Sequence, residues 1–442
     1  MQLVSRLGQR LRIWFARMDP YLVRGVARYY RKGMQLFWWY GVFLSLSSAF
    51  VDSYITLFIL SLGGSRLQVG SLSSLASLFG LLLPLPGAQW AARWGKRKPV
   101  VVISFGLRYV ALLAALSAPL FAAGPALVGV VIGCFALRAA FLHLGNSPWT
   151  SFVGELMPPA RRGRYFSSRK MAMAIATLIF VPAAGQLIAL FREPTGYQVS
   201  FFVALVCGAV GLYLFSRIPE RAPVVPAKQE RLNLAFWKLL RRTPTFWRFA
   251  LTAMLFNFSW QFSAPYFGVY QVEVLGATAR IIGWMAMIQA FMRVVGQYIW
   301  GRLVDRRGAA WTFTLCMLFI PLLPFLWLPL TSPWQLVFVL APSGFLWAGQ
   351  EVAIFNLIFD LAGEERQTEA IASYNTLQAM ANIAGPLLGG QVVQLLGYRW
   401  DFVLSGIGRF AAAILFLAVL KPFDLRKFVR LRLGHRAEAD ST

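Results

Sequence analysis

Twelve long apolar stretches follow one another along nearly the whole sequence. Each reaches or exceeds the ~20 residues that a helix needs to cross a hydrocarbon core about 30 Å thick. Backbone polar groups cannot stay unpaired in lipid, so stretches of this kind must be helical, and strand-type alternation is absent. The expected spans are residues 35–61, 68–92, 99–122, 126–156, 170–191, 198–216, 247–272, 281–300, 310–329, 334–360, 371–396 and 400–420.

Charge is scarce in this chain and unevenly distributed. Only 14% of the residues are charged, against about 25% in an average soluble domain. The net charge of +26 would suit a nucleic-acid partner, but 35 of the 43 Lys and Arg residues fall on one side of the expected spans and only four on the other. This bias predicts cytoplasmic N- and C-termini and attraction to an anionic inner leaflet, and it argues against nucleic acid.

The polar intervals divide the chain into five parts. A basic amphipathic pattern at 1–33 predicts a helix lying on the inner leaflet, with binding to a partner as the alternative. Two six-helix bundles are expected at 34–217 and 246–421, joined by a cytoplasmic linker at 218–245 that holds several prolines. A basic cytoplasmic tail follows at 422–442.

The two bundles resemble each other in sequence. "WAARWGKRKP" after span two and "LVDRRGAAW" after span eight align Gly95 with Gly308, at an offset of 213 residues. "VPAAGQ" in span five and "GPLLGG" in span eleven align at an offset of 204, and so do Arg162 and Arg366 before those spans. Matches at nearly one offset indicate a duplicated six-helix unit, an architecture of transporters. The glycines of "GPLLGG" also predict a close approach of span eleven to a neighbouring helix.

The box "GRLVDRRG", residues 301–308, resembles the G-x-L-x-D-R-x-G motif of the major facilitator superfamily. The resemblance covers about residues 34–421. The box lies between spans eight and nine, where members of that family carry the motif. It implies an all-α membrane protein with twelve transmembrane helices in two pseudo-symmetric six-helix bundles, the major facilitator fold, working by alternating access. Residues 147–170 are similar to poorly characterised bacterial members, which implies the bacterial inner membrane and names no substrate.

The resemblance further implies that Asp305 faces the beginning of span five and closes a cytoplasmic gate. In the first copy of the box Ala92 stands where the Asp is expected, and the cations that remain there would meet Glu364 and Glu365 before span eleven. The alternative is that this basic cluster serves membrane orientation alone. The expected gate residues are Gly301, Asp305, Arg306, Gly308, Arg93, Gly95, Lys96, Arg97, Glu364 and Glu365.

Ionisable residues inside the spans are costly and are therefore candidates for function. Asp52, Glu351 and His143 are candidates for proton coupling, with Arg138 or Arg293 tuning the proton affinity of the carboxylates. In a second interpretation Asp52 with Arg138, and Glu351 with Arg293, form permanent ion pairs that hold each half together. Two further intramembrane arginines, Arg108 and Arg409, lie in spans that usually pack on the outside, which favours structural roles for them.

In the fold that the resemblance implies, spans one, four, seven and ten line a solute cavity, and spans eight and eleven contribute to it. The expected cavity residues are Arg138, Asn146, Asn257, Trp260, Gln261, Arg293, Trp347, Asn375 and Gln378, with Tyr266 as a further aromatic. The aromatic residues favour proton-coupled efflux of an amphipathic compound by an antiporter. Uptake of a sugar or other polar metabolite is the alternative, since the Asn and Gln stripes would supply hydrogen bonds. A non-transporting receptor or scaffold on the same fold is the third.

Enzymatic activity has no support in the sequence. No nucleophile–base set, metal-ligand spacing or G-x-x-x-x-G-K-[ST] box occurs, so neither a cofactor nor ATP is expected. The three cysteines, Cys134, Cys207 and Cys316, fall inside expected spans and are interpreted as packing residues. The expected partners are a small-molecule substrate, a proton or another ion, and the lipid bilayer, with the chain itself a monomer.

Overall fold

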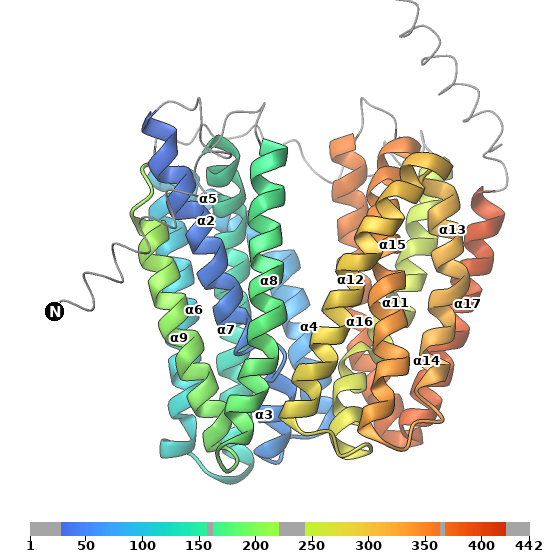
Figure 1. Ribbon diagram of the computed structural model, residues 1–442, viewed down its shortest axis with the longest axis horizontal. Coiled ribbons are helices and arrows are strands. Elements are labelled where there is room, and N and C mark those ends of the chain that lie inside the picture. Colours follow the sequence, from blue (N-terminus) through green and yellow to red (C-terminus); the bar gives the residue numbers. More distant parts are fainter. Residues whose placement is uncertain (1–27, 157–161, 221–243, 363–366, 421–442) are drawn as a thin grey trace, which may run out of the picture. The chain divides into compact units, whose positions relative to one another are not determined.

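The computed structural model describes residues 28–156, 162–220, 244–362 and 367–420, and the regular structure in these ranges is helical throughout (Figure 1). Nine of the described helices are long and apolar enough to cross a membrane, and the bent pair α4 and α5 makes a tenth. The prediction of an all-helical membrane protein is therefore confirmed.

Every one of the twelve expected spans is occupied by helix. The first six positions are taken by α2 (Arg28–Ala49) with α3 (Ile55–Ser61), α4 (Arg66–Leu82) with α5 (Pro84–Trp94), α6 (Lys98–Phe121), α7 (Gly124–Glu155), α8 (Arg162–Ala189) and α9 (Thr195–Ser216). The other six are α11 (Pro244–Glu273), α12 (Ala279–Arg307), α13 (Ala309–Phe319) with η2 (Ile320–Leu322) and α14 (Leu323–Leu326), η3 (Pro333–Leu336) with α15 (Val337–Ala362), α16 (Gln367–Leu396) and α17 (Tyr398–Leu420).

The helices at the first and seventh expected spans are less apolar or shorter than the other ten, for different reasons. The first span is divided between α2 and α3 by a turn at residues 50–54, so neither piece alone is a long apolar helix. In α11 the length is ample, but polar residues such as Asn257, Gln261 and Gln271 dilute its apolar character. Polar groups on a spanning helix must face protein or water rather than lipid, which marks α11 as a helix with an inward polar face.

The helices fall into two units by their contacts. Unit 1 holds residues 1–54 and 82–226, and unit 2 holds residues 55–81 and 227–442. The expected bundles at 34–217 and 246–421 were drawn from the internal repeat of the sequence. They differ from the two contact-defined units in placing residues 55–81 with the first bundle. The bundle boundaries stay a prediction.

Polar contacts attach α4 to unit 2. Arg66 at the start of α4 forms an ion pair of 2.8 Å with Glu273 at the end of α11. Tyr398 at the start of α17 donates a hydrogen bond of 2.7 Å to the same carboxylate oxygen, Oε2, and the Arg66 guanidinium lies 4.7 Å from the centre of the Tyr398 ring. Three helices of unit 2 are thereby tied together at one carboxylate.

Each half of the sequence repeat contains a tyrosine in its first span that is hydrogen-bonded to the main chain of its fifth span, and that fifth span contains a proline. In unit 1 the Tyr54 hydroxyl donates a hydrogen bond of 2.6 Å to the carbonyl of Val181, which precedes Pro182 in α8. In unit 2 the Tyr266 hydroxyl donates one of 2.5 Å to the carbonyl of Pro386 in α16. Both tyrosines are fully buried, and the matched bonds agree with the duplication read from the sequence.

The glycines of "GPLLGG" have the predicted packing role. A Cβ at Gly385 would lie 2.9 Å from the Cβ of Gln261, and one at Gly389 would clash with the carbonyl oxygen of Phe262. Backbones of α16 and α11 therefore meet where only glycine fits, a means of helix association that works in lipid.

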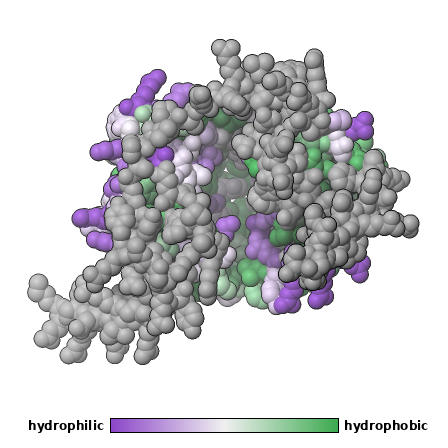
Figure 2. All heavy atoms as spheres, turned by 90° about the horizontal axis from the view of Figure 1, so that it is seen from above, coloured by the Kyte–Doolittle hydropathy of each residue, from purple (hydrophilic) through white to green (hydrophobic). Residues whose placement is uncertain are grey.

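The two charged boxes share a turn that needs glycine. Gly95 ends α5 with φ of 64°, and Gly308 ends α12 with φ of 89°. Positive φ is disfavoured for residues with a Cβ, so glycine is the residue that lets each helix stop and the chain reverse. Figure 2 views one end of the helices and shows hydrophilic side chains gathered there. The predicted N-terminal helix, most of the linker and the C-terminal tail lie outside the described residues.

Gly389→Ala tests the glycine contact. The added methyl group has no space against Phe262, so we expect a loss of about 1–3 kcal/mol in the free energy of unfolding. Thermal unfolding in detergent micelles measures it, with Gly133→Ala in α7 as the matched control because its Cβ would meet open space. Equal melting temperatures for the two variants would refute the close approach.

Candidate functional site

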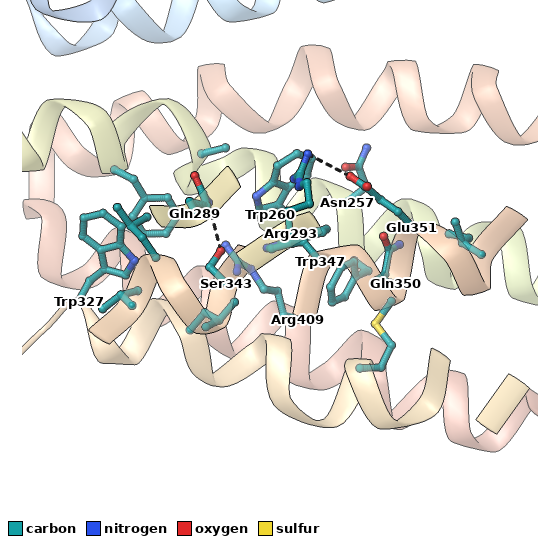
Figure 3. A pocket seen from close by; sticks show the side chains of 18 of the residues that line it. Asn257, Trp260, Gln289, Arg293, Trp327, Ser343, Trp347, Gln350, Glu351 and Arg409 are labelled. Carbon is teal, nitrogen blue, oxygen red and sulfur yellow. Dashed lines mark hydrogen bonds and ion pairs between the residues drawn. The ribbon is translucent and has the colours of Figure 1, made fainter. Parts of the chain in front are cut away.

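A cavity of about 520 Å³ lies within unit 2. It is lined by residues of α11, α12, α15, α16 and α17, with Met317, Leu323 and Trp327 from the chain between α12 and η3. This volume is in the range of about 300–1,000 Å³ found for small-molecule sites. Figure 3 shows polar and aromatic side chains from several of these helices pointing into it.

Aromatic rings form much of the cavity wall. Trp260 of α11 and Trp347 of α15 pack with ring centres 4.7 Å apart, and Phe256 lies 6.0 Å from Trp347. At another part of the wall Phe267 stacks on Trp327 at 4.6 Å. Ring faces of this kind bury large apolar area and hold flat or apolar solutes.

An ion pair lies at the cavity wall. Arg293 of α12 and Glu351 of α15 approach to 3.4 Å between Nη1 and Oε1, and each side chain is 45% exposed. The distance is long for a charge-assisted hydrogen bond, and the exposure lets water or solute reach both groups. Figure 3 draws this pair beside Asn257 and Trp260.

A third charged residue of the cavity, Arg409 of α17, has a different environment. The residue is only 1% exposed, and its Nε and Nη2 atoms have no hydrogen-bond partner among the described residues. Figure 3 shows its guanidinium reaching toward Ser343 of α15, whose hydroxyl oxygen lies 3.5 Å from the Gln289 side-chain nitrogen. The sequence favoured a structural role for Arg409, and the structure adds that this residue lines the cavity.

Amides between α11 and α16 are bonded to one another. Asn257 donates to Asn382 Oδ1 at 2.7 Å and to the Gln378 carbonyl at 3.3 Å. Gln261 donates to the same Asn382 oxygen at 2.9 Å. Asn257 and Gln378 line the cavity, whereas Gln261 does not. Many of the hydrogen bonds that these amides can form therefore join α11 to α16 and are not available to a solute.

Unit 1 carries a second ion pair. Arg138 Nη2 of α7 donates a hydrogen bond of 2.8 Å to Asp52 Oδ1, in the turn between α2 and α3. The Arg138 side chain is 9% exposed and that of Asp52 is 48% exposed. The carboxylate therefore reaches solvent while the guanidinium does not, in contrast to the equally exposed partners of the pair in unit 2.

Other predicted residues are scattered. His143 is half-buried and Asn146 exposed on α7, and Asn375 is exposed on α16. None of the three lines the cavity of unit 2. The prediction that Tyr266 faces a cavity is wrong, because the glycines of α16 let that helix cover the tyrosine, whose hydroxyl is bonded to the Pro386 carbonyl.

The predicted gate residues are described in part. Asp305 and Arg306 are exposed at the end of α12, and Arg93 and Lys96 are exposed at the end of α5. Glu364 and Glu365 lie outside the described residues.

The structure adds a carboxylate to the first box. Glu220, after α9, accepts hydrogen bonds from the backbone N–H groups of Arg97 at 2.5 Å and Lys98 at 3.1 Å. These groups lie at the start of α6, where the helix dipole favours a negative charge. The box is therefore bound within unit 1 by a residue that the sequence analysis did not single out.

The chain is similar in sequence to one protein family and to two bacterial proteins. A model described as the Major Facilitator Superfamily matches residues 37–279 and 250–437. Multidrug resistance protein MdtG of Dickeya zeae (strain Ech586) is 24% identical over 431 residues, which cover 92% of this chain and 98% of the relative. Methylenomycin A resistance protein of Bacillus subtilis (strain 168) is 24% identical over 301 residues, 65% of this chain and 59% of the relative.

Solved structures agree in fold. The nucleoside transporter NupG matches with a TM-score of 0.71 at 12% identity, covering 87% of this chain and all of that one. A D-xylose-proton symporter matches with a TM-score of 0.60 at 15% identity, covering 88% of this chain and 96% of that one. These identities establish the fold alone, and the fold is the one that the sequence resemblance implied.

The unequal exposure of the two ion pairs predicts unequal costs of breaking them. Asp52→Asn leaves Arg138 buried without its partner, and removing one partner of a fully buried pair costs about 3–5 kcal/mol, an upper bound for this half-exposed carboxylate. Glu351→Gln should cost no more than about 1 kcal/mol, because both partners are exposed. Thermal unfolding of the purified variants compares them.

The double variant Asp52→Asn with Arg138→Met serves as the control, since it removes the buried charge along with its partner and should regain much of the lost stability. Equal losses for Asp52→Asn and Glu351→Gln would contradict the assignment.

Proposed function

The chain belongs to the Major Facilitator Superfamily, a family of multi-pass membrane transporters of small molecules, and we propose that it exports an amphipathic compound in exchange for protons. The observation that carries the proposal is the composition of the cavity, where tryptophan and phenylalanine rings surround one exposed ion pair and a few polar groups. Such a lining suits a solute with an apolar body and a polar end.

The direction of transport is proposed from the relatives. The two curated relatives carry names of resistance proteins, one for multiple drugs and one for methylenomycin A. Resistance by a membrane transporter means removal of the compound from the cell, which supports efflux for this chain. Uptake of a sugar is less well supported, because Asn257, Gln261 and Asn382 are hydrogen-bonded to one another.

Glu351 is the proposed coupling acid. It lies at the cavity wall, its side chain is 45% exposed, and its ion pair to Arg293 is long, at 3.4 Å. Protonation of Glu351 would remove the charge that holds Arg293, and solute binding and proton binding would then compete for the same part of the wall. Asp52 is the second candidate because its carboxylate is similarly exposed, although its arginine partner is buried.

Orientation and gating complete the proposal. The excess of Lys and Arg in alternate loops supports cytoplasmic termini and the bacterial inner membrane.

We propose that Asp305, together with Arg93, Lys96 or Arg97 facing Glu364 and Glu365, forms the latch of the cytoplasmic side. Exposed pairs of this kind contribute about 0–1 kcal/mol each, enough to bias two conformations of nearly equal free energy.

Proton coupling can be measured without a labelled solute. Purified protein in liposomes containing the pH-sensitive dye pyranine is challenged with a panel of amphipathic compounds, including ethidium, chloramphenicol and 2-naphthoate. We expect the wild-type chain to move protons when at least one compound is added, and Glu351→Gln to reduce this flux at least tenfold while solute exchange continues. Glu193→Gln, an exposed carboxylate in the loop before α9, is the matched control. Full proton flux in Glu351→Gln would eliminate that residue as the coupling acid.

Charge reversal tests the latch. If the proposed latch forms, the double variant Glu364→Lys and Glu365→Lys would bring like charges against Arg93 and Lys96, and the cytoplasmic side should open more often. The readout is the labelling rate of a cysteine placed at Asn257 in a background lacking Cys134, Cys207 and Cys316, with a membrane-impermeant maleimide added from the cytoplasmic side. Labelling should accelerate several-fold, and an unchanged rate would reject the latch.

A further inference from the structure

We propose that the cavity of unit 2 contains a binding site for an anionic group of the solute, such as a carboxylate, formed by Arg409, Ser343 and Gln289. This inference rests on the proposed function, because it assumes that the cavity receives the transported compound, and it narrows the amphipathic solute to an organic anion.

The first argument is the charge of the cavity. Three ionised side chains line it, and two of them, Arg293 and Glu351, compensate each other at 3.4 Å. The third, Arg409, adds a positive charge without an ion-pair partner in the described chain. The charged side chains that line the cavity therefore sum to one positive charge, which favours a solute with one negative charge.

The second argument is the state of Arg409 itself. Arginine stays charged in proteins and offers five N–H donors, yet two of its nitrogens here are buried with no acceptor. Leaving a buried charged donor unsatisfied costs free energy that an incoming carboxylate would recover. Planar, two-pronged recognition of carboxylates is the contact for which the guanidinium geometry is best suited.

The third argument is that further donors lie beside Arg409. Ser343 and Gln289 line the same cavity as Arg409, and in the view of Figure 3 its guanidinium points toward them. The Ser343 oxygen accepts from Gln289, so its own O–H remains available to donate, and the Gln289 amide has a second N–H. Ser343 is itself buried, at 9% exposure. Positive and neutral donors therefore share one side of the cavity, while the rings of Trp260 and Trp347 offer an apolar surface elsewhere in it.

Asp401 is an alternative partner for the positive charge of Arg409. It is fully buried on the same helix, eight residues earlier, which is about 12 Å along the axis. The two groups attract each other electrostatically, but no ion pair joins them, and both Asp401 carboxylate oxygens lack a hydrogen-bond partner among the described residues. Asp401 does not line the cavity. If it nevertheless balanced Arg409 at a distance, the arginine would matter for stability alone, and the experiment separates the two roles.

The experiment compares two probes of the same shape, 2-naphthoate and 2-naphthamide, of which only the first is charged at pH 7. Their affinities for the full purified chain are measured by titration calorimetry. We expect the wild type to bind naphthoate about tenfold or more tightly than naphthamide. Arg409→Gln should remove this preference by weakening naphthoate alone, and Arg409→Lys should keep part of it. Arg108→Gln, a buried arginine outside the cavity, is the matched control and should keep the preference whole.

Four results would overturn the assignment. Equal wild-type affinities for the two probes would reject the anion site and leave the proposed efflux standing, as would an unchanged preference in Arg409→Gln. If Arg409→Gln and Asp401→Asn both lower the melting temperature while the preference stays unaltered, Arg409 is a structural partner of Asp401. If neither probe binds, the cavity does not receive organic anions. The pyranine flux assay decides separately on the proposed function, since its panel includes cationic and neutral compounds.

Discussion

Hydrocarbon offers no partner for a polar group, and this constraint governs the whole chain. It makes the described regular structure helical, because a helix pairs its own backbone. It also decides where side-chain polarity is found. The Tyr54 and Tyr266 hydroxyls reach carbonyls at the prolines of neighbouring helices, and Arg138 reaches Asp52. Arg409 differs from these pairs, because two of its nitrogens have no hydrogen-bond partner among the described residues and it lines a cavity of molecular size.

The sequence was sufficient for the fold and for its repeat. Apolar length predicts the spans, and the boxes ending in Gly95 and Gly308 predict the duplication, because both depend on properties that short segments carry by themselves. The ion pairs inside the spans could also be predicted from the sequence. Asp52 with Arg138, and Glu351 with Arg293, were named as possible pairs because an ionised group in lipid is stabilised by a group of opposite charge, and the structure contains both pairs.

The composition of the cavity was harder to predict. Helices that are apolar on most sides give little periodic signal of which face turns inward. Tyr266 of α11 was expected at a cavity and is buried against α16 instead, whereas Arg409 of α17, for which a structural role was favoured, lines a cavity. The position of Tyr266 depends on glycines more than a hundred residues away that let α16 approach. For Arg409 the one available signal was its charge, which made it a functional candidate wherever the helix turned.

The hydrogen bonds of Tyr54 and Tyr266 have a consequence for how such proteins change over time. Each bond closes within one unit and joins a side chain to a main-chain carbonyl, so it does not depend on the identity of the residue that supplies the acceptor. Cavity residues can therefore be exchanged without loosening the frame that holds them. A chimera that keeps one half of this chain would keep the tyrosine bond of that half intact, so new solute preferences can arise while the scaffold stays the same.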